Sequence, residues 1–528
     1  MQKFKQTSNS MLMIARDVCG RRLSVRRSMV AFAAALSLLA CARSQQTMDL
    51  ATPDKPTREP PSPTYDPAVV QGIGCAGGMC EHNRLPGNVP VIDATGVFTT
   101  VSANGSIDLG NEFFQDLGTN GRRCVSCHVP AVGWTITPKQ LQIVFDATDG
   151  GVRDHGQGLG AVFRTVDGSN SPSADVSTLA KRRRAYSMLL TRGVIRVGLP
   201  IPRDADFELV AVDDPYHFAS ATELSLFRRP LPTTNLKFDS TVMWDGREVV
   251  SGQTVAFDLT NQANTAVVTH AQGKGLTQAQ RESIVHFEVA LASAQIIDRQ
   301  AGDLHAAGAR GGPGEILAQP FHIGINDNLG DPVTGAPFSP VIFTLFDRWD
   351  QIADRDDHDR DDRGRINEAR RSIARGQAIF NSHPITISGV SGINDEVAFG
   401  KPATLKGTCG TCHDTPNGGN HSVVAPLNLG LADASRRTPD MPLYTLRNKT
   451  TGETVQVTDP GRAMIDGKWS HIGRFKGPML RNLAPRAPYF HNGSAADLDA
   501  VVNFYDDRFH IGLTRRDKAD LVAFLRSL

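Results

Sequence analysis

The sequence predicts an all-α fold that is mainly helical, contains long irregular loops and is organised as two similar domains. Three observations lead to this prediction. Helical patterns of apolar residues run through residues 276–294, 371–380 and 495–528. No stretch shows a convincing alternation of apolar and polar residues, which is the pattern of a half-buried strand. One short motif occurs twice, at residues 124–128 and 409–413, and gives the chain its two halves.

The N-terminus has the features of an export signal. Basic residues between positions 21 and 27 precede the apolar stretch Met29–Ala40, which is too short to span a membrane as a helix. The end of this stretch and the residue after it, Leu38-Leu39-Ala40-Cys41, resemble a lipobox. We therefore expect residues 1–41 to be a lipoprotein-type signal peptide, with a lipid anchor at Cys41; the alternative is ordinary signal cleavage nearby.

Residues 42–95 are predicted to be a tether. Proline and polar residues dominate its first part, and such a composition favours an extended chain. Cys75 and Cys80 close a short Gly-bearing loop. In an oxidising compartment a local disulfide is expected there, and the alternative is a redox-active pair.

The amphipathic stretch 276–294 is predicted to be a core helix. Ile284, Phe287 and Leu291 recur at helical spacing, and Thr277 stands where an N-cap is expected.

The repeated motif predicts covalently bound haem. Each copy reads Cys-x-x-Cys-His, in which two thiols add to the vinyl groups of one porphyrin and the histidine binds the iron. The residues are Cys124, Cys127 and His128 in the first copy and Cys409, Cys412 and His413 in the second. The alternative, half of a zinc site, needs further Cys or His pairs at ligand spacing, and every other cysteine precedes residue 81. We therefore expect two haem c groups, which are typical of a protein exported to the periplasm.

Three further stretches resemble the bacterial di-haem cytochrome c peroxidase and MauG family. They are Trp244-Asp245-Gly246-Arg247 followed by Gln253, the segment 375–380, and the segment 476–493 (KGPMLRNLAPRAPYFHNG). The resemblance extends from about residue 110 to the C-terminus, and segment 476–493 is its most specific part. It implies two cytochrome c-like domains that face each other, a peroxidatic domain at residues 96–320 and an electron-transfer domain at residues 321–528.

The resemblance also implies the iron ligands. His128 becomes the proximal ligand of the peroxide-facing haem, and His413 that of the electron-transfer haem. Tyr505 stands where the peroxidases have a methionine ligand and where MauG has a tyrosine. We therefore expect it to be the sixth ligand of the second haem, where an anionic oxygen favours ferric and higher-valent iron. The rival ligands are Met479, Met464 and His421.

Two side chains are implied to be catalytic. Trp244 matches the tryptophan between the two haems, where an indole can pass an electron; the alternative is a buried core tryptophan. Gln253 is expected to hydrogen-bond a bound oxygen species. Asn264 replaces the glutamate of the family, so another group has to move the proton between the peroxide oxygens. The candidates that remain open are Asp258, Asn261, Gln262 and His270.

The resemblance implies one further bound ion and one open iron. An inter-haem calcium ion would be held by the backbone carbonyls of Arg486 and Pro488, but Arg229 stands where the family has an asparagine ligand. No histidine follows His128 at the spacing of the family's capping loop, and His155 is the nearest later one. We therefore expect the first haem to keep an open face, as in MauG.

The leading functional hypothesis is a peroxide-dependent oxidoreductase. Its oxidising equivalents come from hydrogen peroxide and are quenched by a small c-type cytochrome or cupredoxin, or, in a MauG-like high-valent state, by a protein substrate. One alternative is a dioxygen-dependent di-haem oxygenase similar to the rubber oxygenases. Another is a non-catalytic electron carrier or sensor. A net charge of +1 gives no indication of nucleic-acid binding, and contact with a membrane is expected only through the lipid anchor.

Overall fold

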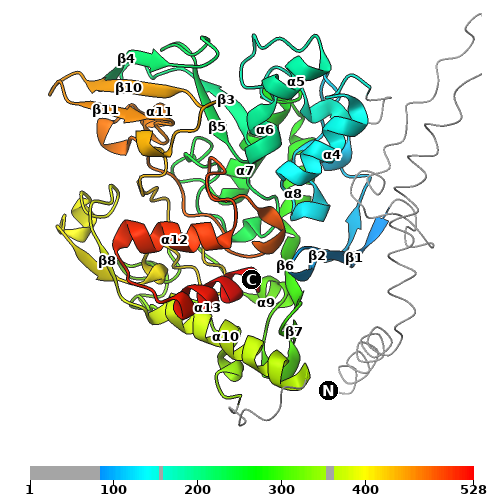
Figure 1. The fold of residues 1–528 in the computed structure, drawn as a ribbon, viewed down its shortest axis with the longest axis vertical. Coiled ribbons are helices and arrows are strands. Elements are labelled where there is room, and N and C mark those ends of the chain that lie inside the picture. Colours follow the sequence, from blue (N-terminus) through cyan, green and yellow to red (C-terminus); the bar gives the residue numbers. More distant parts are fainter. Residues whose placement is uncertain (1–83, 154–157, 353–361) are drawn as a thin grey trace, which may run out of the picture. The chain divides into compact units, whose positions relative to one another are not determined.

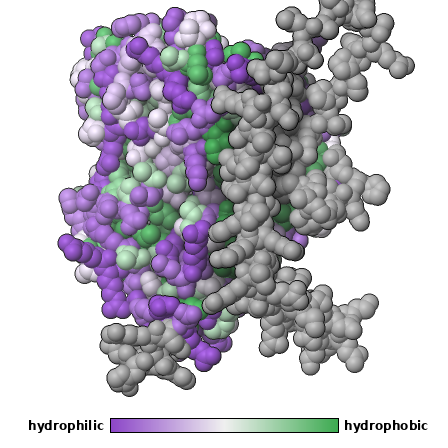
Figure 2. Space-filling model, turned by 45° about the vertical axis from the view of Figure 1, so that its right-hand side comes forward, coloured by the Kyte–Doolittle hydropathy of each residue, from purple (hydrophilic) through white to green (hydrophobic). Residues whose placement is uncertain are grey.

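The structure is a computed structural model that describes residues 84–153, 158–352 and 362–528. The predicted signal peptide, the predicted lipid anchor at Cys41, the Cys75–Cys80 pair and His155 lie outside the described residues. No helix within the described ranges is long and apolar enough to cross a membrane. On the face drawn in Figure 2, hydrophilic residues predominate on the visible coloured surface and hydrophobic residues form smaller patches.

The prediction of an all-α fold is wrong, because strands and helices are mixed along the described chain (Figure 1). The strands within the described ranges form four sheets. They are β1 (Arg84–Ile92), β2 (Gly96–Asp108), β3 (Ile195–Leu199), β4 (Phe207–Asp213), β5 (Leu224–Arg228), β6 (Leu291–Asp298), β7 (Gly302–Asp303), β8 (Ile385–Ile387), β9 (Leu405–Gly407), β10 (Leu443–Asn448) and β11 (Thr454–Val457).

The α-helices of the described ranges alternate with groups of these strands along the chain. They are α4 (Pro138–Thr148), α5 (Leu179–Ala185), α6 (Ser187–Arg192), α7 (Val255–Thr269), α8 (Gln278–Val289), α9 (Pro313–Ala318), α10 (Asp362–Ser382), α11 (Ala463–Asp466), α12 (Leu498–Phe509) and α13 (Arg515–Arg526).

The predicted helix 276–294 shows why the sheets escaped detection. Its first part is correct, because Thr277 caps α8 and forms a capping box with Gln280. The chain leaves the helix at Ala290, however, and Leu291 begins strand β6. The first five residues of β6 are all buried. A short apolar run without alternation cannot be distinguished from a buried helical segment by its period.

Strand β6 lies inside the antiparallel sheet β1-β2-β6-β7. Strand β1 comprises residues 84–92, which the sequence analysis placed in the tether. The sheet also positions the first motif, because the indole nitrogen of Trp134, just beyond this motif, donates to Thr100 Oγ1 of β2 at 2.8 Å.

The two halves of the chain share a sheet. Strand β4 from the first half pairs with β10 from the second, and β11 completes the order β11-β10-β4. In Figure 1 β4 and β10 lie side by side although they are far apart in the sequence. The buried Tyr444 of β10 fixes this junction, because its hydroxyl donates to the carbonyl of Ser225 at 2.8 Å and accepts from the amide of Ser225 at 2.9 Å.

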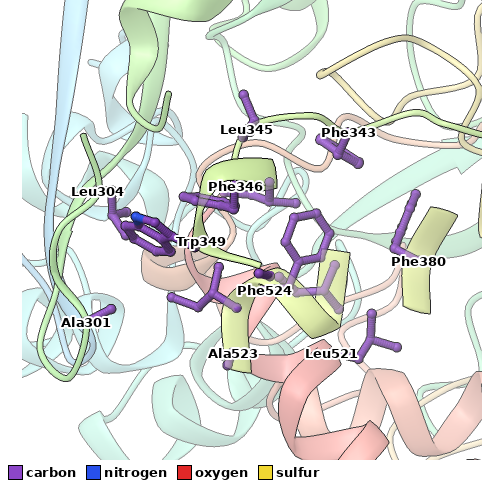
Figure 3. Close-up of a cluster of buried hydrophobic side chains, with 14 of the residues drawn as sticks. Ala301, Leu304, Phe343, Leu345, Phe346, Trp349, Phe380, Leu521, Ala523 and Phe524 are labelled. Carbon is purple, nitrogen blue, oxygen red and sulfur yellow. The ribbon is translucent and has the colours of Figure 1, made fainter. Parts of the chain in front are cut away.

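The largest buried apolar cluster supports the second motif. Helix α10 packs against α13, which also contacts α12. Gly376 of α10 allows the close approach, since a Cβ there would lie 2.0 Å from the carbonyl oxygen of Asp520. Figure 3 shows the aromatic centre of this cluster, where Phe524 of α13 packs edge-on against Phe343 at a ring-centroid distance of 5.3 Å.

Candidate functional site

The two Cys-x-x-Cys-His motifs adopt the same local geometry. The cysteine-bearing part of each forms one short 3-10 turn, Cys124–Ser126 and Cys409–Thr411. In each turn a hydroxyl accepts a hydrogen bond from the backbone amide of the residue before the first cysteine. The hydroxyl is that of Ser126 in the first motif, at 3.1 Å, and that of Thr411 in the second, at 3.0 Å. The histidine amide then bonds the carbonyl of the first cysteine, at 3.0 Å in the first motif and 3.2 Å in the second.

Both motif histidines are oriented by a backbone carbonyl. Nδ1 of His128 lies 3.4 Å from the carbonyl of Trp134, and Nδ1 of His413 lies 2.5 Å from that of Gly419. A carbonyl can only accept, so Nδ1 carries the hydrogen and Nε2 keeps its lone pair, which is the arrangement of a metal-ligating histidine. Burial lowers the pKa of both imidazoles, that of His128 to about 4, which keeps them neutral.

Each motif forms part of the wall of one cavity. The cavity that contains Cys124, Cys127 and His128 in its wall, here the His128 cavity, has a volume of about 160 Å³. The cavity that contains Cys409, Cys412 and His413, here the His413 cavity, has a volume of about 230 Å³ and a more apolar wall. The site residues implied for the two haems are therefore divided between two separate cavities.

The residues of both cavities fit a covalently held haem. All four motif cysteines are free thiols, and burial raises the pKa of Cys127 to about 11 and that of Cys412 to about 12, so neither of these two thiols is acidic. In the wall of the His413 cavity, His491 is 1% exposed and neither of its ring nitrogens has a hydrogen-bond partner. Unpaired buried nitrogens are costly, and a carboxylate-bearing ligand such as a porphyrin propionate would satisfy them.

Trp244 lies in the wall that the two cavities share. It lines both of them together with residues 229–232. Its indole nitrogen donates to the carbonyl of Arg229 at 2.8 Å, and its own carbonyl accepts the amide of Lys476 at 2.9 Å. The ring is half-buried and meets His491 edge-on at 6.2 Å.

The Trp-Asp-Gly-Arg segment is held in place by buried charge. Asp245 is fully buried and pairs with Arg228, whose guanidinium also binds Asp459 through two hydrogen bonds of 2.8 and 2.9 Å. Burial alone would raise the pKa of Asp245, but Arg228 and Arg247 hold it below its usual range. The aspartate therefore anchors the neighbouring tryptophan, and Gly246, at φ 69°, supplies the turn.

Helix α7 covers one side of the His128 cavity. Its lining residues recur on one helical face and include the polar Gln262, and the C-cap residue His270 also lines the cavity. His270 bonds Asp167, which in turn pairs with the buried Arg122. These three residues form a hydrogen-bonded network on the cavity wall.

The other residues predicted for the distal pocket lie elsewhere. Gln253 is exposed just before α7 and does not line the cavity. Asp258 is buried and accepts the amide of Val250 at 3.0 Å, and Asn261 is not among the lining residues. Asn264 accepts the amide of Leu276 at 2.8 Å, which closes the connection to α8.

Glu288 is a pocket residue that the sequence analysis missed. It belongs to α8, lines the His128 cavity and is 4% exposed. Its Oε2 atom has no hydrogen-bond partner, and burial raises the pKa of this carboxyl to about 8. The carboxyl therefore holds its proton at neutral pH. The sequence analysis searched for the acid close to Trp244 and so did not consider Glu288. A charged residue at a core position of an amphipathic helix is unusual, however, and could have indicated a functional site.

Some candidate sixth ligands of the second haem line the His413 cavity and others do not. Tyr505 of α12 lines the His413 cavity, and so does the buried Met479. The hydroxyl of Tyr505 makes no hydrogen bond to the described residues. Met464 is packed in the core behind sheet β11-β10-β4, and His421 is buried outside the cavity wall, with Nε2 3.6 Å from Asp414. Only Tyr505 and Met479 among the four therefore face the cavity.

The implied calcium site does not fit the residues present. The carbonyl of Arg486 accepts a hydrogen bond of 2.9 Å from Nη2 of Arg229. A cationic side chain therefore already uses one of the oxygens implied as a calcium ligand. Within the described ranges, no group of three or more His, Cys, Asp or Glu side chains is arranged to hold a metal ion.

Comparison with known proteins finds distant relatives over a limited part of the chain. A cytochrome-c peroxidase of Denitromonas iodatirespirans is 32% identical over 135 residues, which are 24% of this chain and 37% of the relative. The cytochrome c peroxidase of Escherichia coli is 38% identical over 89 residues, 16% of this chain and 19% of the relative. The chain thus matches well under half the length of these relatives. No family model matches the sequence. The chain is therefore a distant homologue of cytochrome-c peroxidases.

Proposed function

We propose that this chain is an exported di-haem c peroxidase that reduces hydrogen peroxide with electrons from a small redox protein. The observation that carries the proposal is the pair of cavities, each with a Cys-x-x-Cys-His motif in its wall, separated by Trp244. The distant homology to cytochrome-c peroxidases supports the same reaction and implies haem c as the cofactor. The balance is one peroxide, two electrons and two protons to two waters.

The haem in the His128 cavity would supply the iron at which the oxygen–oxygen bond is broken. The chain's own residues have two tasks there. Glu288 holds a proton inside the cavity at neutral pH, because burial raises the pKa of its carboxyl to about 8. Gln262 presents an amide from α7, and the hydrogen-bonded Arg122–Asp167–His270 network adds polar groups to the same cavity wall. Proton delivery by a positioned acid is the usual requirement for breaking such a bond.

The His413 cavity is suited to receiving electrons. Its wall is largely apolar and contains no Asp or Glu side chain, unlike the wall that carries Glu288. Trp244 reaches this cavity as well as the His128 cavity, so its indole shortens the distance that an electron must cross between them. The calcium ion of relatives has no step in this proposal.

Turnover of the purified holoprotein with peroxide and a reduced small c-type cytochrome tests the proposal. We expect two covalent haems per chain, and loss of turnover in both the His128→Ala and the His413→Ala variant. His286→Ala, at an exposed position of α8, is the matched control and should behave as the wild type. Fewer than two haems, or oxygen uptake without peroxide turnover, would contradict the peroxidase and favour the oxygenase.

We further propose that Tyr505 is the sixth ligand of the second haem, as in MauG. Replacing it by methionine should raise the midpoint potential of that haem by on the order of 0.1 V, since methionine ligation favours the ferrous state over phenolate ligation. Potentiometric titration followed by EPR measures the change. Met479→Leu is the control, because Met479 lines the same cavity. An unchanged potential for Tyr505→Met together with an altered EPR spectrum for Met479→Leu would assign the ligand to Met479.

A further inference from the structure

Arg229 carries a buried positive charge that no carboxylate of the described residues neutralises. The residue is 6% exposed and lines both cavities. Its guanidinium donates only to backbone carbonyls of the described residues. They are Arg192 at 2.9 Å, Gly193 at 3.4 Å, Ile136 at 2.8 Å and Arg486 at 2.9 Å. A cage of carbonyl oxygens is the environment of a hard metal cation, and here a side chain occupies it.

The carbonyls that Arg229 gathers come from distant parts of the chain. Ile136, Arg192 and Gly193 belong to the first half, whereas Arg486 belongs to segment 476–493. Gly193, whose φ is 61°, leaves space for the side chain of Arg229. A Cβ at this position would lie 2.4 Å from Nη1 of Arg229, so a larger residue would clash with the guanidinium. The guanidinium therefore ties the two halves together at the point where the cavities meet.

The backbone of the same residue also bonds Trp244 in the shared wall and His491 in the wall of the His413 cavity. The amide of Arg229 donates to the carbonyl of His491 at 2.6 Å, and its carbonyl accepts the indole N–H of Trp244 at 2.8 Å. A change in the position of the guanidinium is thus transmitted through one residue to Trp244 and His491.

The carbonyl of Arg486 that Arg229 binds belongs to a second buried arginine. Arg486 is also buried, and its guanidinium donates to the carbonyls of Gly133 and Arg481, at 2.9 and 2.8 Å, and to Thr234 Oγ1 at 3.0 Å. A divalent ion on the carbonyl of Arg486 would lie beside the guanidinium of Arg229 in a region of low dielectric, where like charges repel strongly.

We infer that the guanidinium of Arg229 replaces an inter-haem calcium ion, so that this chain sets the geometry of Trp244 without a divalent cation. Arg229 is a positioning residue, acting on Trp244 through its carbonyl and on His491 through its amide. The inference uses the two-haem proposal only for its spectroscopic readout; the metal content and the stability of the protein test it even if the protein has no peroxidase activity.

The wild-type holoprotein provides the first test. We expect no stoichiometric calcium by mass spectrometric elemental analysis after gel filtration. Neither EGTA nor added CaCl2 should change the Tm, the EPR spectrum of the ferric protein or the tryptophan fluorescence. A calcium ion bound one per chain, whose removal by EGTA changes any of these signals, would overturn the inference whether or not the protein turns over peroxide.

The variant Arg229→Asn provides the second test, because it frees the carbonyl of Arg486 and adds an amide oxygen. In EGTA it should have a lower Tm and altered EPR and fluorescence spectra, and CaCl2, but not NaCl of equal ionic strength, should restore them. Arg447→Asn removes an exposed arginine paired with Glu208 and should show no response to calcium. Wild-type spectra and Tm for Arg229→Asn in EGTA, or a loss that calcium does not reverse, would overturn the replacement. If this variant does not fold, the wild-type measurements decide.

Discussion

The Arg228→Met variant is expected to lose about 3–5 kcal/mol of unfolding free energy at neutral pH, as is typical when one partner of a buried ion pair is removed. The arginine side chain is 2% exposed, and its partners Asp245 and Asp459 are 0% and 3% exposed. Methionine fills a similar volume but leaves both carboxylates without their shared counter-ion. Unfolding in guanidinium chloride, followed by circular dichroism and tryptophan fluorescence, measures the loss.

The pH dependence of the same variant has a definite sign. In the wild type, Arg228 and Arg247 hold the pKa of Asp245 below its usual range against the effect of burial. The ionised aspartate therefore contributes stability above the ordinary aspartate pKa of about 3.9, and this contribution is lost as the pH falls. Without Arg228 the folded-state pKa rises instead. The deficit of the variant should be largest at neutral pH and should shrink in acid.

Arg447→Met is the matched control for Arg228→Met. Arg447 also joins the two halves of the chain, through Glu208, but the two side chains are 50% and 42% exposed. Exposed ion pairs contribute about 1 kcal/mol or less. Equal losses in the two variants would show that the buried network of Asp245 does not stabilise the fold.

The functional residues that could be predicted are those whose geometry is local. A Cys-x-x-Cys-His motif contains its own turn and its own carbonyl acceptor nearby, so the sequence places Cys124 and His128 on one cavity wall before any tertiary structure is known. Thr277 was recognised as a helix cap for the same reason, since a capping box spans only a few residues. The C-terminal helices α12 and α13 are amphipathic over their own length and were also predicted.

The features that escaped prediction depend on segments that are distant in the chain. Strand β6 is defined by its pairing with β2, and its fully buried start removes the alternation that reveals a strand. Gln253 was placed by spacing from Trp244, but the turn before α7 leaves it exposed. The cage around Arg229 consists of backbone carbonyls. Every residue has a backbone carbonyl, so the residue types gave no indication of this cage.

Replacing Glu288 by glutamine is expected to lower peroxide turnover by about 10²- to 10⁴-fold, the range that a positioned acid contributes. Glutamine keeps the size of the side chain and its hydrogen-bonding capacity but carries no transferable proton. Since burial raises the pKa of Glu288 to about 8, wild-type turnover should fall as the pH rises through that value, and the residual activity of the variant should lack this fall. Steady-state rates across the pH range measure both effects.

The pH dependence of stability gives an independent check on Glu288. A carboxyl whose folded-state pKa lies above its unfolded value of 4.5 contributes stability at low pH that is lost as the pH rises towards about 8. Glu288→Gln should therefore remove this loss and be relatively more stable than the wild type in base. Glu282→Gln, at an exposed position of the same helix, should change neither turnover nor stability. If Glu288→Gln retains its haems and turns over peroxide at the wild-type rate, the proton reaches the substrate from another group, such as the His270–Asp167 pair, which lines the same cavity.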